Sequence, residues 1–291
     1  MNKLHVTWRS RLNTLAALLG VVGCIGSMSV TLASDDLHEH GRYVFYAAGC
    51  ISCHTRDQLM AGGRSVVTPF GTFYPPNATP QREYGIGGWS EEDFIRALRE
   101  GVSPRGEHYY PAFPYGSYTR MSRQDMQALY AYLMTLPASS SDVPSHELYW
   151  PYSIRPLIAY WKAQRFSPGE YTADPSRSPR WNRGAYLAEA LGHCGECHTP
   201  RGRIGDLLAS QWLAGAPNPD GEGRVPNITP AGKTISSWST GDIEYYLESG
   251  FTPDFDTTGG TMVAVQENMA RLTAADRKAI AAYLKAVPSV E

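Results

Sequence analysis

The pentapeptide Cys-x-x-Cys-His occurs twice in the 291-residue chain, at positions 50–54 and 194–198. This spacing is the attachment signature of c-type haem, in which two thiols add to the porphyrin vinyl groups and the adjoining imidazole binds the iron. Two copies predict two covalently bound haem c groups and a role in electron transfer, because iron alternates between two oxidation states. The predicted thioether residues are Cys50, Cys53, Cys194 and Cys197, and the predicted iron ligands are His54 and His198.

Cys-x-x-Cys pairs also occur in two other kinds of site. One pair can form a redox-active dithiol, and two pairs can share a zinc ion. Neither chemistry uses the histidine that follows the second cysteine in both copies. The repeated histidine therefore favours haem over a dithiol or a zinc centre.

The composition narrows the class of protein. The net charge is −2 and 19% of the residues are charged, so nothing in the electrostatics favours nucleic-acid binding. The length suits two domains of ordinary size. The 21 prolines and 28 glycines predict loop-rich domains. Such domains can be small, because a haem supplies apolar surface to pack against.

The first 33 residues have the pattern of an export signal. Three basic residues precede an uncharged stretch at 12–34, and Thr31-Leu32-Ala33 resembles a cleavage site. Two alternatives are that Cys24 carries a lipid anchor, or that the stretch remains as a transmembrane helix. Each of the three sends the rest of the chain across a membrane. We therefore expect a periplasmic protein, either free or anchored to the inner membrane.

The chain also repeats itself around the two motifs. Gly41-Arg42-Tyr43 corresponds to Gly184-Ala185-Tyr186, and Pro-Asn-x-Thr-Pro occurs at 76–80 and at 226–230. A Trp-Ser-x-x-Asp segment follows at 89–93 and again at 238–242. The repeat predicts a first cytochrome domain at 34–137, a linker at 138–182 and a second cytochrome domain at 183–291.

The expected fold is all-α, because no segment alternates over the length of a strand. Ser90 and Asp93 predict the start of a helix that ends at Gly101, and Ser122 predicts the start of another. A third helix is expected to lead into each haem motif. In the linker, residues 154–166 predict a helix that either braces the two domains or contacts a partner or membrane.

The sixth ligand of the second iron is sought among two methionines. Met262 follows a glycine-rich stretch at 259–261, which we expect to be a loop that can bend over the haem face. Met269 lies closer to the last helix and is expected to pack. Met262 is therefore the predicted ligand, and a thioether ligand suits electron transfer.

The predicted sixth ligand of the first iron is Met121. It follows His54 at nearly the spacing at which Met262 follows His198. Alignment of the final helices instead places Met121 opposite Leu272, so the two ligand loops must differ in length. His108 is an alternative ligand, although a histidine beside a glutamate is more often a solvated loop residue.

Several further segments resemble a known family. They include Gly62-Gly63-Arg64, Thr68-Pro69-Phe70-Gly71-Thr72, Tyr110-Pro111-Ala112-Phe113-Pro114 and Trp181-Asn182-Arg183-Gly184. The family is that of the membrane-associated multihaem cytochrome c subunits of bacterial alcohol, gluconate and related dehydrogenases. The resemblance extends from about residue 41 to residue 288. It implies class-I-like cytochrome domains in tandem, joined by a helical linker.

The resemblance also implies a dehydrogenase as the electron donor and a cytochrome, an oxidase or a quinone-linked protein as the acceptor. The alcohol dehydrogenase subunits carry three haem motifs and this chain carries two. A two-haem form resembles the cytochromes that accompany molybdenum-containing hydroxylases. The alternative function is a two-haem enzyme, a peroxidase or an oxidase of a small sulfur compound, with a labile sixth ligand on the first haem.

Overall fold

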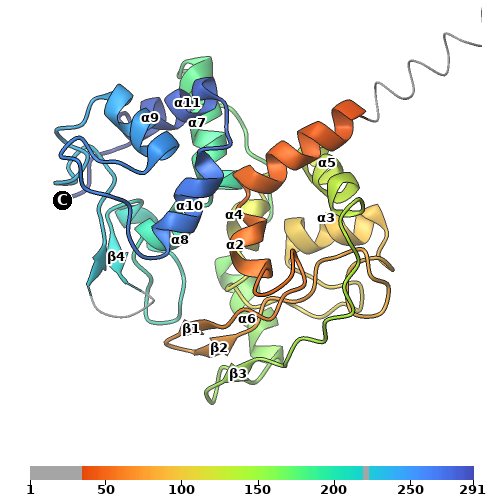
Figure 1. Cartoon of the computed structure of the whole chain (residues 1–291). Helices are drawn as coiled ribbons and strands as arrows, with labels where there is room; N and C mark the ends of the chain where they lie inside the picture. Colours follow the sequence, from red (N-terminus) through yellow and green to blue (C-terminus); the bar gives the residue numbers. More distant parts are fainter. Residues whose placement is uncertain (1–34, 219–222) are drawn as a thin grey trace, which may run out of the picture.

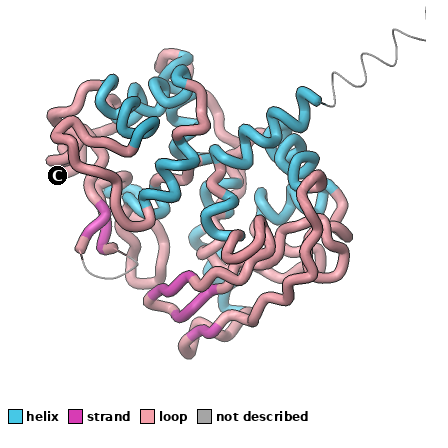
Figure 2. Tube along the Cα trace, in the orientation of Figure 1, coloured by secondary structure: helices cyan, strands magenta, loops and turns pink. Residues whose placement is uncertain are grey.

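The computed structural model describes residues 35–218 and 223–291. The segment predicted to be an export signal or anchor lies outside these residues. Two helical lobes lie side by side, formed by the N-terminal and C-terminal halves of the chain (Figure 1). Much of each lobe is loop, in agreement with the high proline and glycine content (Figure 2).

The first lobe begins with a helix at residues 35–47, which leads into the short helix α2 (Cys50–His54). Three helices follow it: α3 (Glu91–Glu100), α4 (Tyr115–Tyr118) and α5 (Arg123–Leu133). The predicted helix ends are confirmed. Ser90 and Asp93 form a capping box, Gly101 ends α3 in the left-handed conformation, and the Ser122 hydroxyl accepts from the Asp125 N–H at the start of α5.

The second lobe repeats this order. Helix α7 (Pro179–Tyr186) continues as a π-helical turn (Leu187–Leu191) that leads into α8 (Gly195–His198). A 3₁₀ turn (Ala209–Gln211) follows, and then α9 (Thr240–Ser249), α10 (Met262–Met269) and α11 (Ala274–Leu284). Helix α10 was not predicted. Met262, which we expected to lie in a loop, is the first residue of this helix.

Short strands qualify the all-α expectation. β1 (Val66–Thr68), β2 (Gly71–Phe73) and β3 (Glu147–Leu148) form an antiparallel sheet in that order. β4 (Ala216–Pro217) pairs with β5 (Arg224–Val225) in the second lobe. Strands of two or three residues are too short to show alternation in the sequence, which is why they were missed.

The first helix of each lobe crosses the last helix at a glycine. A Cβ atom on Gly41 would lie 2.0 Å from the Ala128 carbonyl oxygen, and one on Gly184 would lie 1.9 Å from the Ala279 carbonyl oxygen. Only glycine permits an approach this close. The crossing brings the helix before each haem motif against the closing helix of its domain, and the buried apolar residues of both lobes form one continuous cluster.

The predicted linker helix is present as α6 (Pro156–Arg165). Its Lys162 ammonium group, which is buried, donates to the carbonyl oxygens of Glu100 and Gly101 in the first lobe. The Trp161 indole donates to the Ile204 carbonyl oxygen of the second lobe at 3.0 Å. The helix therefore contacts both lobes, as the brace interpretation predicts. No helix among residues 35–218 and 223–291 has the length and apolar character needed to span a membrane.

Candidate haem-attachment sites

Each Cys-x-x-Cys-His motif forms a short helix of its own. In both motifs the first cysteine, Cys50 or Cys194, is half-buried and packs against the apolar core. The second cysteine, Cys53 or Cys197, is exposed. Both motifs therefore present one sulfur atom next to the core and one at the surface of the lobe.

The motif histidines form equivalent hydrogen bonds. His54 Nδ1 lies 2.8 Å from the Pro76 carbonyl oxygen, and His198 Nδ1 lies 2.8 Å from the Pro226 carbonyl oxygen. A carbonyl oxygen can only accept, so Nδ1 carries the proton in each ring and Nε2 keeps its lone pair. An imidazole whose tautomer and orientation are fixed in this way is prepared to bind a metal through Nε2. The donor set therefore fits haem iron in both lobes.

The Pro-Asn-x-Thr-Pro segments hold these carbonyl groups in place. The Asn77 side-chain oxygen accepts from the Thr79 N–H at 2.9 Å and from the Thr79 hydroxyl at 2.7 Å. The Asn77 amide donates to the Ser139 carbonyl oxygen at 2.7 Å, at the start of the linker. Asn227 forms the same bonds with Thr229 and with the carbonyl oxygen of Val290. Each asparagine thus ties the histidine's acceptor to the segment that follows the last helix of its lobe.

Two glycines pack beneath the same peptide. A Cβ atom on Gly62 would lie 2.6 Å from the Pro76 carbonyl carbon, and one on Gly215 would lie 2.9 Å from the corresponding atom of Pro226. Gly62 N–H also donates to the His54 carbonyl oxygen at 2.8 Å, and Gly215 does so to His198 at 2.7 Å. The Pro-Asn-x-Thr-Pro repeat is visible in the sequence, but the support that it and the two glycines give to the histidines was not predicted. Their recurrence next to both motifs was the available signal.

Burial sets the protonation of the motif side chains. It lowers the pKa of His54 and His198 below the ordinary 6.5, partly opposed by the hydrogen bonds to proline carbonyls, so both rings are neutral at pH 7. Burial, reinforced by the neighbouring cysteine, raises the pKa of Cys50 to about 12 and that of Cys194 to about 12. Thiols with a pKa this high are protonated at neutral pH, which does not suit a reactive dithiol.

The candidate sixth ligands lie in different settings. The Met121 side chain is 0% exposed, in the apolar core between α4 and the Ser122 cap. Met262 is half-buried at the start of α10, and Met269 is buried at the end of that helix as the packing interpretation predicts. His108 is half-buried with no hydrogen-bond partner for its Nδ1 in the described chain, so it is not the solvated loop residue that was expected.

The segments around the two motifs touch each other. Asn268 of α10 donates to the hydroxyl of Ser52, inside the first motif, at 2.8 Å. The ring of His193, which precedes the second motif, lies 5.6 Å from the ring of Tyr118. The Ser117 hydroxyl donates to Glu196, inside the second motif, at 3.2 Å. The attachment sites therefore lie on facing sides of the contact between the lobes.

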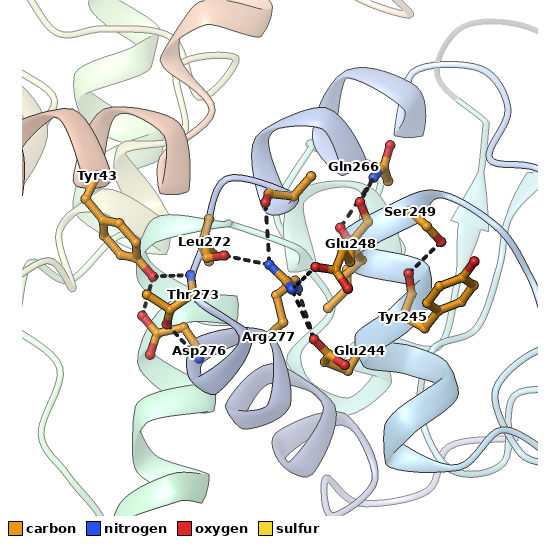
Figure 3. A network of polar contacts seen from close by, with 12 residues as sticks. Tyr43, Glu244, Tyr245, Glu248, Ser249, Gln266, Leu272, Thr273, Asp276 and Arg277 are labelled. Atoms are coloured by element: carbon orange, nitrogen blue, oxygen red, sulfur yellow. Dashed lines mark hydrogen bonds and ion pairs between the residues drawn. The ribbon is translucent and has the colours of Figure 1, made fainter.

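A reciprocal pair of contacts holds the lobes together. The Tyr43 hydroxyl of the first lobe donates to Asp276 of the second at 2.5 Å and accepts from the Thr273 N–H at 3.3 Å (Figure 3). The Tyr186 hydroxyl of the second lobe donates to Asp125 of the first and accepts from the Ser122 N–H at 3.0 Å. Tyr43 and Tyr186 occupy equivalent positions in the repeat. We call these contacts the tyrosine clasp.

Removing one hydroxyl of the tyrosine clasp is expected to destabilise the chain. Burial alone would raise the pKa of Asp276, but hydrogen bonds from Arg183 and Tyr43 bring it below its ordinary 3.8. The carboxylate is therefore charged at neutral pH, and the stability that its hydrogen bond contributes is lost as the pH falls below 3.8 and through the lowered pKa. We expect Tyr43→Phe to lower the free energy of unfolding by about 1.5 kcal/mol at pH 7, because a bond to a charged acceptor is lost.

Urea unfolding measures this loss. The control is Tyr160→Phe, at a tyrosine that is 70% exposed on α6 and should unfold like the wild type. The difference between Tyr43→Phe and the wild type should shrink once the pH falls below the lowered pKa of Asp276, because the carboxylate is then protonated. A difference that does not change with pH would contradict the charged-acceptor argument.

Comparison with known proteins identifies the family. The cytochrome c family matches at residues 38–137 and 182–288. The chain belongs to the cytochrome c family. A diheme cytochrome c-type protein of Cereibacter sphaeroides is 47% identical over 260 residues, which cover 87% of this chain and 86% of the relative. The chain therefore carries two covalently bound haem c groups.

Two further relatives are named as dehydrogenase subunits. The fructose dehydrogenase cytochrome subunit of Gluconobacter japonicus is 41% identical over 86% of this cytochrome and 52% of the relative. The gluconate 2-dehydrogenase cytochrome c subunit of Pantoea cypripedii is 35% identical over 94% of this cytochrome and 64% of the relative. The cytochrome thus spans about half and just under two thirds of these two longer proteins. They bear out the resemblance to dehydrogenase cytochrome subunits.

Proposed function

We propose that this cytochrome takes single electrons from a partner dehydrogenase and passes them to a respiratory-chain acceptor in the periplasm. The observation that carries the proposal is the pair of equivalent histidine sites, His54 and His198, each locked to a proline carbonyl in one molecule. The kinship with fructose and gluconate dehydrogenase subunits supports a dehydrogenase as the donor. The export pattern of residues 1–33 supports the location, with or without an anchor to the inner membrane.

The chain's own residues perform three tasks in this function. A bound haem c supplies an iron that gains or loses one electron while keeping its ligands. The Pro76 and Pro226 carbonyl groups orient the imidazoles and, by accepting from Nδ1, make Nε2 a stronger donor. The contacts of Ser52 with Asn268 and of Tyr43 with Asp276 fix the separation of the two sites. A redox pair at fixed separation suits a carrier that receives an electron on one lobe and releases it from the other.

Methionine sulfur completes the proposed ligand sets, with Met121 on the first iron and Met262 on the second, in class-I-like domains. A thioether raises the reduction potential and closes the coordination sphere. The complete burial of Met121 supports this role, since a thioether in the apolar core would be shielded from water.

Replacement of Met121 tests that assignment. We expect Met121→His to lower the midpoint potential of one haem by about 0.2 V, a part of the span of about 0.8 V that axial ligands cover. The near-infrared sulfur-to-iron band should fall to half its intensity. The control is Met126→Leu, a core methionine that is also 0% exposed and should leave spectrum and potential unchanged. An unaltered band in Met121→His would contradict the assignment.

The function itself is tested on the purified holoprotein from a host competent in cytochrome maturation. We expect mass spectrometry to find two haems and to distinguish a cleaved, a lipidated and an intact N-terminus. We expect the near-infrared band to account for two methionine ligands. We also expect reduction by the co-purified dehydrogenase and its substrate. Turnover of peroxide or thiosulfate by the isolated chain would favour the two-haem enzyme instead.

A further inference from the structure

One residue of the second lobe violates the pattern of three matching turns. Seven-residue hairpins close at 102–108, 201–207 and 251–257, each with a bridge between its end residues. In each hairpin the second residue donates its N–H to the sixth, and the fifth donates its N–H to the second. The three turns therefore have one backbone design, and a difference at one position can be judged against two internal references.

The fifth position of this turn has a positive φ in all three hairpins. Gly106 and Gly205 occupy it with φ of 82° and 85°. In the third turn it is Phe255, with φ of 62°. A large side chain with positive φ is strained, and glycine is the residue that relieves the strain. Phe255 therefore does not improve the turn.

Packing does not explain Phe255 either. Its side chain is 90% exposed, more than any other large apolar residue in the described parts of the chain. Tyr245 and Phe251 beside it are 52% and 44% exposed. Together with Asp242, Thr252 and Pro253, these three aromatic residues line a surface recess of about 340 Å³. A strained and exposed phenylalanine at the edge of an aromatic recess is the arrangement of an anchor for a partner.

The segment that carries this anchor has charges of a single sign. Residues 240–270 contain no lysine, arginine or histidine. They contain six acidic residues: Asp242, Glu244, Glu248, Asp254, Asp256 and Glu267. The equivalent stretch of the first lobe, at 91–121, mixes five acidic residues with four arginines. Of these two segments, only the one in the second lobe combines an exposed aromatic anchor with charges that are all acidic.

Not all of these carboxylates are available to a partner. Glu244 and Glu248 are held by the buried Arg277 on the inner side of α9. Asp254 and Asp256 are exposed on either side of Phe255. In Figure 3 Tyr245 lies on the far side of this ion-pair network from Tyr43 of the tyrosine clasp.

We propose that the face formed by Asp242, Tyr245, Phe251, Asp254, Phe255 and Asp256 is the docking site for a redox protein whose own face is basic around an apolar hollow. Phe255 enters the hollow, and Asp254 and Asp256 face the basic rim. Charge complementarity of this kind raises the association rate, and a central aromatic anchor slows dissociation. The proposal depends on the electron-carrier function only for the redox nature of the partner.

Phe255→Gly is the decisive variant, because it restores the residue found in the two reference turns. It should raise the thermal midpoint by about 3 °C as the backbone strain is relieved, so loss of folding cannot explain an effect on binding. The probe is mitochondrial cytochrome c, a small basic redox protein. In stopped-flow experiments at low ionic strength, we expect its electron-transfer rate constant to fall about tenfold in the variant. The midpoint potentials of both haems should not change.

Two further variants complete the experiment. Asp254→Asn should reduce the rate about threefold at low salt and leave it unchanged at high salt, because exposed charges are then screened. Tyr160→Ala, which removes an aromatic side chain that is 70% exposed on α6, should have no effect. A Phe255→Gly rate equal to wild type, or a wild-type rate that does not change with salt, would overturn the proposal.

Calorimetric binding of the oxidised probe separates this inference from the proposed function. Weaker binding by Phe255→Gly, in a protein that exchanges no electrons with any carrier, would support the docking site and refute the electron carrier. Rapid electron exchange with equal binding by the wild type and the variant would do the reverse.

Discussion

Gly184→Ala should lower the thermal midpoint of the second lobe by about 12 °C, which corresponds to a loss of about 3 kcal/mol. The added methyl group would lie 1.9 Å from the Ala279 carbonyl oxygen and 2.9 Å from Tyr283 Cβ. Helices α7 and α11 must therefore move apart to accept it. Alanine is the better helix former by about 1 kcal/mol, so a net loss means that the steric conflict outweighs helix propensity.

Calorimetry of the holoprotein measures this change in the thermal midpoint. Two further variants serve as an equivalent substitution and as a control. Gly41→Ala creates the same conflict with Ala128 in the first lobe and should lower the stability of that lobe by a similar amount. Gly169→Ala is the control, because no atom lies within 4 Å of the added methyl group and the backbone there is not left-handed. A midpoint for Gly184→Ala within 2 °C of the control would show that the helix crossing is more adaptable than its geometry indicates.

Asn77→Ala is expected to change both stability and redox potential. Asn77 is 3% exposed, and its removal leaves the buried Thr79 and the half-buried Ser139 carbonyl group without these hydrogen bonds. We expect a loss of about 3 kcal/mol in the free energy of unfolding. The Pro76 carbonyl group then loses its support, the His54 hydrogen bond weakens, and the midpoint potential of the first haem rises because its imidazole becomes a poorer donor.

Spectroelectrochemical titration and urea unfolding measure the two effects on the same sample. Asn77→Asp keeps the oxygen that accepts from Thr79 and loses the amide that donates to Ser139. Its free energy of unfolding and its midpoint potential should therefore lie between those of the wild type and of Asn77→Ala. Asn227→Ala should shift the potential of the second haem instead of the first. If Asn77→Ala and Asn227→Ala shift the midpoint potential of the same haem, the assignment of each asparagine to its own site is wrong.

The features that the sequence revealed are local ones. Ser90, Asp93 and Gly101 act within one helix, and the Cys-x-x-Cys-His motif needs only five consecutive residues. These features depend only on residues that are close together in the sequence, so the sequence pattern is enough to predict them. The repeat extended these readings from one lobe to the other.

The features that the sequence did not reveal depend on distant contacts. Helix α4 has four residues and cannot form without the core that buries Tyr115 and Tyr118. The Tyr43–Asp276 hydrogen bond joins residues 233 positions apart, and the sequence next to either residue does not indicate its partner. Phe255 was overlooked for a different reason, since a phenylalanine in a sequence does not show that its backbone is left-handed.

The tyrosine clasp resembles the contact of a symmetric homodimer, in which each half uses the same face to bind the other. Tyr43 donates to Asp276 and Tyr186 donates to Asp125, so the two faces bind each other within one molecule. Because each of these faces is already covered by the other, neither can bind a second molecule in a polymer. Any larger assembly of this cytochrome must therefore grow from surfaces that the two halves do not share.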